Sequence, residues 1–137
     1  YCAAQNVLFC GDALFSAGCG RVFEGTLLQM HRSLERLKAL PNATQIYCAH
    51  EYTENNLRFA QTVNPQNLDL QKKAREVALL RAAEKPSVPF YLGEEKTTNP
   101  FLRCDVLEIK QAAQKIEPNA QSPAEVFAVL REWKNKF

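Results

Sequence analysis

The first fifty residues show two short apolar runs separated by a helix-like stretch. The run from Val7 to Cys10 ends in a glycine-aspartate turn and predicts a strand buried on both faces. Thr26-Leu27-Leu28-Gln29 is a capping-box pattern, and apolar residues then recur at helical spacing until Pro41. Residues 45–49 form the second apolar run. A strand, a crossover helix and another strand predict an α/β fold built on a βαβ-like unit.

The pattern changes at residue 52, after which strand signals almost vanish. Helices are expected over residues 53–62 and 67–85, then from Asp105 through Ile116, and from Ser122 to the last residue. Ser122-Pro123-Ala124-Glu125 is the strongest start signal, because it combines an N-cap serine, a proline at the first helical position and a glutamate at the third. We therefore expect two segments, residues 1–52 with the strands and residues 53–137 as an all-helical domain.

Composition narrows the class of protein. The chain has 137 residues, is 46% hydrophobic and 23% charged, and carries a formal net charge of only +2. Its basic residues are spread out, so we expect no nucleic-acid partner, and no apolar stretch approaches the roughly 18 residues of a membrane span. Five cysteines without a C-x-x-C pair predict reduced thiols and a cytoplasmic location. The chain opens without methionine and runs at once into a strand, which suggests a piece of a longer protein.

Two candidate metal ligands follow the two predicted strands. Asp12 comes after the first strand and His50 after the second. The carboxyl ends of neighbouring strands share one sheet edge, and an oxygen and a nitrogen donor there suit zinc, manganese or iron. Each residue also has a structural interpretation, Asp12 as a turn or N-cap residue and His50 as a structural histidine whose hydrogen bonds are satisfied within the fold. The only other histidine, His31, is expected on a solvated helix face, so the chain offers two ligands where zinc needs at least three.

Four further residues are candidates for ligand binding, and each has a plainer alternative. Tyr52 lies just past His50 and can donate a hydrogen bond or simply sit at the rim. Arg21 follows Gly18-Cys19-Gly20, where the chain can approach a ligand, but it can also be a surface cation. Arg131 and Lys134 share one helix face and suit an acidic small molecule. Composition alone favours a solvated basic face at the helix end.

Five blocks of sequence together resemble one family. They are L-F-C-G-D-A-L-F, G-C-G-R-V-F-E-G-T, Y-C-A-H-E-Y-T-E-N-N-L, N-P-F-L-R and the terminal L-R-E-W-K-N-K-F. The chain resembles glyoxalase II, the hydroxyacylglutathione hydrolases of the metallo-β-lactamase superfamily, along nearly its whole length. The resemblance implies the C-terminal part of an αββα metallo-β-lactamase domain over residues 1–52, followed by a helical glutathione-binding domain over residues 53–137. It also implies hydrolysis of S-D-lactoylglutathione to D-lactate and glutathione, a step of methylglyoxal detoxification.

The resemblance also implies a role for each candidate. Asp12 matches the carboxylate that bridges two divalent metal ions, zinc first with iron or manganese possible, and His50 matches the last histidine ligand. The positions that contact glutathione are matched by Arg21, Phe23, Tyr52, Arg131 and Lys134, although several relatives carry tyrosine at residue 23.

The chain lacks the family's H-x-H-x-D-H motif, which supplies most metal ligands. The missing N-terminal half of the same protein is thus an expected partner, and the chain alone is expected to be inactive. A non-catalytic module for glutathione conjugates and a helical interaction domain are the alternatives.

Overall fold

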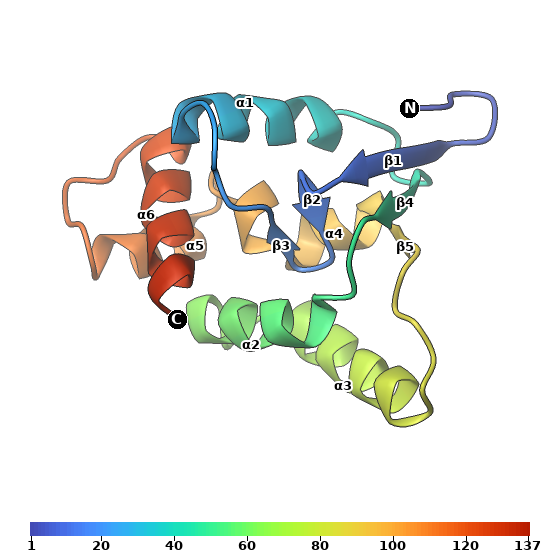
Figure 1. The fold of residues 1–137 in the computed structure, drawn as a ribbon. Helices are drawn as coiled ribbons and strands as arrows, with labels where there is room; N and C mark the ends of the chain where they lie inside the picture. Colours follow the sequence, from blue (N-terminus) through green and yellow to red (C-terminus); the bar gives the residue numbers. More distant parts are fainter.

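A computed structural model describes all 137 residues and shows an α/β fold (Figure 1). The first segment contains the predicted strand, helix and strand, with a small hairpin that the sequence did not predict. Its elements are β1 (Val7–Gly11), β2 (Leu14–Phe15), β3 (Gly18–Cys19), α1 (Leu27–Lys38) and β4 (Gln45–Cys48).

The second segment is mostly helical. Its elements are α2 (Thr53–Val63), α3 (Leu68–Ala82), β5 (Phe90–Tyr91), α4 (Leu92–Thr98), the 3-10 helix η1 (Pro100–Leu102), α5 (Leu107–Gln114) and α6 (Pro123–Lys136). The expectation of an all-helical segment was wrong, because β5 pairs antiparallel with β4 and brings Phe90 opposite Ile46. Two residues are too few for periodicity to show a strand, and the free edge of β4 supplies the hydrogen-bonding partners. None of the helices is both long and apolar enough to cross a membrane.

The sheet places two loop ends side by side. β1 and β4 are parallel, with Val7 opposite Gln45 and an irregularity between Phe9 and Gly11. Ala49 donates its backbone N–H to the carbonyl of Gly11 at 3.0 Å, so the chain stays paired up to the end of both strands. The residues that follow each strand therefore leave the sheet at the same edge.

Three helix starts are the ones that the sequence predicts. Thr26 and Ser122 both form complete capping boxes, and Asn67 accepts a hydrogen bond from the backbone N–H of Leu70. We expected Asp105 to begin the helix α5, but the cap position is Val106. The Asp105 carboxylate instead pairs with the Lys38 ammonium on α1 at 3.1 Å. An ion pair to another helix thus replaced the local cap.

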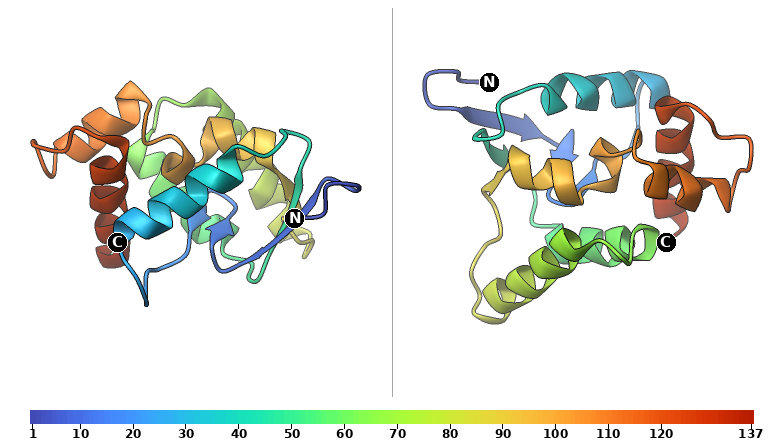
Figure 2. Two further views of the ribbon diagram at one scale, coloured as in Figure 1. Left: turned by 90° about the horizontal axis from the view of Figure 1, so that it is seen from above. Right: turned by 180° about the vertical axis from the view of Figure 1, so that it is seen from behind.

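The core joins the two segments. One apolar cluster contains Leu8 and Leu14 from the strands together with Phe59 on α2 and Leu130 on α6. α1 and α2 lie on opposite sides of the β2–β3 hairpin, and α6 closes the end of this arrangement (Figures 1 and 2). The division at residue 52 stays a prediction, since the core crosses it.

Four burial expectations were wrong. β1 is not buried on both faces, because Phe9 is 74% exposed and only stacks on Tyr47. His31 is buried rather than solvated, since it packs against Phe127 where α1 meets α6. Burial lowers the pKa of His31 and keeps the imidazole neutral. Helical spacing also predicts Ile116 and Phe137 on the core faces of the last two helices, but both lie beyond the ends of these helices and are exposed.

Candidate metal and ligand site

The seven residues singled out from the sequence surround one pocket. Its volume is about 640 Å³, and its lining includes Asp12, Arg21, Phe23, His50, Tyr52, Arg131 and Lys134. These residues come from the loops after β1, β3 and β4 and from α6, which are far apart in sequence. Their individual roles stay predictions, and the structure establishes that the fold brings them together.

Asp12 and His50 meet at this pocket. Asp12 Oδ1 lies 3.3 Å from His50 Nε2, and the two side chains are 69% and 49% exposed. The imidazole stacks on the Tyr52 ring, with centroids 4.9 Å apart, and Phe15 packs against both rings. This aromatic backing restricts the orientation of the imidazole, so that its nitrogen faces the carboxylate.

The donor set is chemically suited to a metal ion but is incomplete. An imidazole nitrogen and a carboxylate oxygen are ordinary ligands of zinc, iron and manganese. No group of three or more His, Cys, Asp or Glu side chains gathers anywhere in the chain that could hold a metal ion. Burial raises the pKa of Cys10 to about 11 and also raises that of Cys48, so both nearby thiols carry a proton when no metal ion is bound. Asp12 and His50 are thus two donors of the types that these metals accept, and two donors are too few for a complete site.

The cations form a second group around the pocket. Arg131 is only 3% exposed, donates to the backbone carbonyl of Cys19 at 2.7 Å and lies over the Phe101 ring. Its Nε is buried without a hydrogen-bond partner. Lys134 is partly buried, and Arg21 is exposed. A solvated basic face, the alternative from composition, does not describe this burial.

No carboxylate neutralises the Lys134 ammonium. Burial, followed by repulsion from Arg131 and Arg21, lowers the pKa of Lys134 to about 8. Its hydrogen-bond partner is the amide oxygen of Asn56 on α2. Cations that are partly desolvated and lack a counter-ion are suited to bind an anion.

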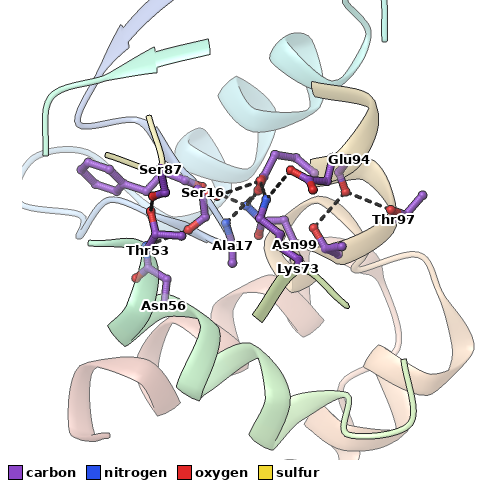
Figure 3. Close-up of polar contacts among 12 residues, drawn as sticks. Ser16, Ala17, Thr53, Asn56, Lys73, Ser87, Glu94, Thr97 and Asn99 are labelled. Carbon is purple, nitrogen blue, oxygen red and sulfur yellow. Dashed lines mark hydrogen bonds and ion pairs between the residues drawn. The ribbon is translucent and has the colours of Figure 1, made fainter. Parts of the chain in front are cut away.

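A buried polar network supports the turn between β2 and β3, and the sequence did not reveal it. The Glu95 carboxylate on α4 accepts hydrogen bonds from the Ser16 hydroxyl at 3.1 Å and the Ala17 N–H at 2.8 Å. It also accepts one from Asn99 and pairs with Lys73 on α3 (Figure 3). The Asn99 amide reaches the carbonyls of Phe15 and Gly18. A lone glutamate in a polar helix gives no sequence signal of such a role.

A second polar contact fixes the loop that carries His50 and Tyr52. The Glu51 carboxylate accepts hydrogen bonds from the backbone N–H and the hydroxyl of Ser87, at 2.6 and 2.7 Å. The same hydroxyl contacts Thr53 Oγ1 at 2.7 Å (Figure 3). Thr53 is of a residue type that favours helix caps, but it is the first residue of α2, and its hydroxyl serves this contact instead.

Comparison with known proteins identifies the family of this chain. A family model described as the hydroxyacylglutathione hydrolase C-terminus matches residues 51–137. The chain belongs to the hydroxyacylglutathione hydrolase family. It is 52% identical over 134 residues to the hydroxyacylglutathione hydrolase of Aeromonas salmonicida, covering 97% of this chain and 53% of that protein.

Two further relatives of the same name are similarly close. The protein of Pseudomonas paraeruginosa is 52% identical over 139 residues, and that of Synechococcus sp. strain JA-3-3Ab is 54% identical over 137 residues. Each alignment covers all of this chain and 54% or 52% of the relative. The chain thus spans about half the length of the hydroxyacylglutathione hydrolases that it matches.

Proposed function

We propose that the protein containing this chain hydrolyses S-D-lactoylglutathione, or a related S-2-hydroxyacylglutathione, to the hydroxy acid and glutathione. The observation that carries the proposal is the single pocket shared by the Asp12–His50 pair and the cationic side chains of Arg21, Arg131 and Lys134. The Asp12–His50 pair suits a metal-assisted hydrolysis, and the cationic side chains suit an anionic thiol such as glutathione. The reaction would serve methylglyoxal detoxification in the cytoplasm, a compartment consistent with five free thiols.

We further propose that residues 1–52 belong to a metallo-β-lactamase domain and residues 53–137 to a glutathione-binding domain. The support is topological. The parallel β1–β4 pair carries Asp12 and His50 at one edge, and α2 and α6 bring side chains from the helical part to the same pocket.

The cations would hold the substrate. Glutathione carries two carboxylates, and the pocket offers Arg21, Arg131 and Lys134. Charge-assisted hydrogen bonds to these groups would anchor the glutathione part and orient the thioester toward Asp12 and His50. Orientation of this kind is worth several kcal/mol of a reaction barrier. The Tyr52 hydroxyl and the exposed Phe23 ring, both at the pocket, would provide further contacts.

Asp12 and His50 would hold two divalent metal ions, zinc first and iron or manganese as alternatives. The Asp12 carboxylate and the His50 imidazole would each be a ligand of this metal centre, whose remaining ligands would come from outside residues 1–137. Bound metal would supply hydroxide at neutral pH. The chain's own contribution is to hold these two donors 3.3 Å apart with the imidazole supported by Phe15 and Tyr52.

A second candidate follows from the same structure for the chain by itself. Its cation group is complete, whereas its donor pair is too small for a metal site. The 137-residue chain alone should therefore bind glutathione without catalysing hydrolysis. No feature of the structure favours a helical interaction domain. That interpretation would apply if the protein neither binds glutathione nor hydrolyses the thioester.

The test compares the full-length protein with the isolated chain. Loss of the thioester absorbance of S-D-lactoylglutathione should be metal-dependent and occur only in the full-length protein, while calorimetry should detect glutathione binding to both. Metal-dependent hydrolysis by the isolated chain would contradict the idea of an incomplete site. Absence of hydrolysis in the metal-loaded full-length protein would refute the proposed function.

A further inference from the structure

Asn56 lies between two parts of the pocket wall. It is only 1% exposed, sits on α2 and lines the pocket beside Lys134. Its side-chain NH₂ donates to the Ser16 carbonyl at 3.0 Å (Figure 3 draws both residues). Its side-chain oxygen accepts a hydrogen bond from the Lys134 ammonium. Both halves of the amide are therefore used, and their chemistry permits only one orientation.

The surrounding backbone is shaped around this amide. A Cβ atom added at Gly18 would lie 2.6 Å from Asn56 Cγ and Nδ2, so the glycine leaves the space that the amide fills. The Ser16 carbonyl belongs to the turn that Glu95 and Asn99 hold from the other side. Asn56 is thus fixed to a rigid part of the fold rather than to a mobile loop.

Lys134 depends on this contact. The charged groups near the Lys134 ammonium are Arg131 and Arg21, and both repel it. The Cys19 thiol also lies nearby, but burial raises its pKa and keeps it largely neutral. The remaining ionisable groups around the pocket are Arg58 on α2 and the trio Asp12, His50 and Tyr52. With two cations as neighbours, a flexible lysine side chain would turn toward water unless an acceptor held it in the pocket.

We infer that Asn56 is a positioning residue of the ligand pocket, which holds the Lys134 ammonium where an anionic ligand reaches it. The inference rests on the proposed function in taking glutathione as the ligand. It differs from that proposal in assigning part of the affinity to a neutral residue whose two hydrogen-bonding groups are already occupied.

The test uses two substitutions with opposite electrostatic effects. Asn56→Asp places a carboxylate beside the ammonium, which should raise the pH at which Lys134 loses its proton. Asn56→Leu has similar size but no acceptor, so it should lower that pH. NMR of the Lys134 side chain against pH reads this midpoint directly. A purely structural role of Asn56 would not move it in opposite directions.

Glutathione binding is the second readout. Both variants should bind glutathione about tenfold more weakly at pH 7, since one neutralises the ammonium and the other releases it. Asn135→Asp is the matched control, because this exposed residue neighbours Lys134 on α6 and receives the same charge. It should change the affinity less than twofold and barely move the midpoint.

Each outcome is decisive. Unchanged glutathione affinity in both Asn56 variants, with a wild-type chain that binds, overturns the inference and leaves the proposed function intact. A wild-type chain that fails to bind glutathione counts against the proposed ligand. In that case the midpoints alone decide on Asn56, since opposite shifts support its positioning role and equal midpoints overturn it. Thermal melts of both variants confirm that the comparison is between folded chains.

Discussion

Removing the buried ammonium of Lys73 should destabilise the chain strongly. Lys73 is 3% exposed and pairs with Glu95, which is fully buried, and with Glu94 at 3.0 Å. Burial alone would lower the pKa of Lys73, but the two carboxylates outweigh burial and raise it, so the ammonium is charged at pH 7. Lys73→Met would leave the Glu95 carboxylate buried without its counter-charge.

The cost follows from what remains around Glu95. Breaking a buried ion pair by removing one partner costs about 3–5 kcal/mol. Three neutral donors, from Ser16, Ala17 and Asn99, still satisfy the carboxylate in the variant. We therefore expect the lower end, a loss of about 3 kcal/mol in the free energy of unfolding. For a chain of this length that loss corresponds to a melting temperature lower by about 10 °C.

Urea unfolding followed by circular dichroism measures this loss, and a double-mutant cycle with Glu95→Gln tests its origin. The double variant should be more stable than the sum of the single losses predicts, by about 2 kcal/mol, since it leaves no unpaired charge in the buried interior. Lys72→Met is the matched control, because Lys72 lies on the same helix and makes only an exposed pair with Glu76 at 3.8 Å. Its effect should stay below about 0.5 kcal/mol. A loss below about 1 kcal/mol for Lys73→Met, or strictly additive effects, would refute this reasoning.

Three further outcomes are expected. Asp12→Asn in the full-length protein should lower kcat by at least about 100-fold and reduce bound metal measured by atomic emission, because an amide replaces the charged donor; full metal content would argue against a ligand role. Lys134→Met should raise KM for the thioester about tenfold with little change in kcat. In the unmodified protein, KM should rise as the pH increases through about 8, because the Lys134 ammonium loses its charge there. A KM that stays constant between pH 7 and 9 would contradict this role. Gly20→Ala should destabilise the chain by about 1–3 kcal/mol, since the new methyl group would overlap the backbone carbonyl of Asp12; an unchanged urea midpoint would show that the loop can move aside.

Local sequence signals determined most of the regular structure. The capping boxes at Thr26 and Ser122 and the cap at Asn67 use side chains three residues from the groups they satisfy, so a short window contains the whole interaction. The two apolar runs indicated the parallel pair of strands, and from it the proximity of Asp12 and His50. The resemblance of five short blocks added a predicted ligand-binding role for these residues, which spacing alone had left open and which stays a prediction.

Only the tertiary structure decided how buried polar groups are paired. Glu95, Lys73 and Asn56 look like ordinary helix-surface residues in sequence, yet each is buried and has a polar partner at least 21 positions away. The same holds for β5, which is a strand because β4 has a free edge, and for Asp105, which pairs with Lys38 instead of capping its own helix. Periodicity reports which face of an element is apolar, but it carries no information about which distant group lies opposite a polar side chain. That choice is made by the packing of the whole chain, since a buried charge or amide must find its partner wherever the fold places one.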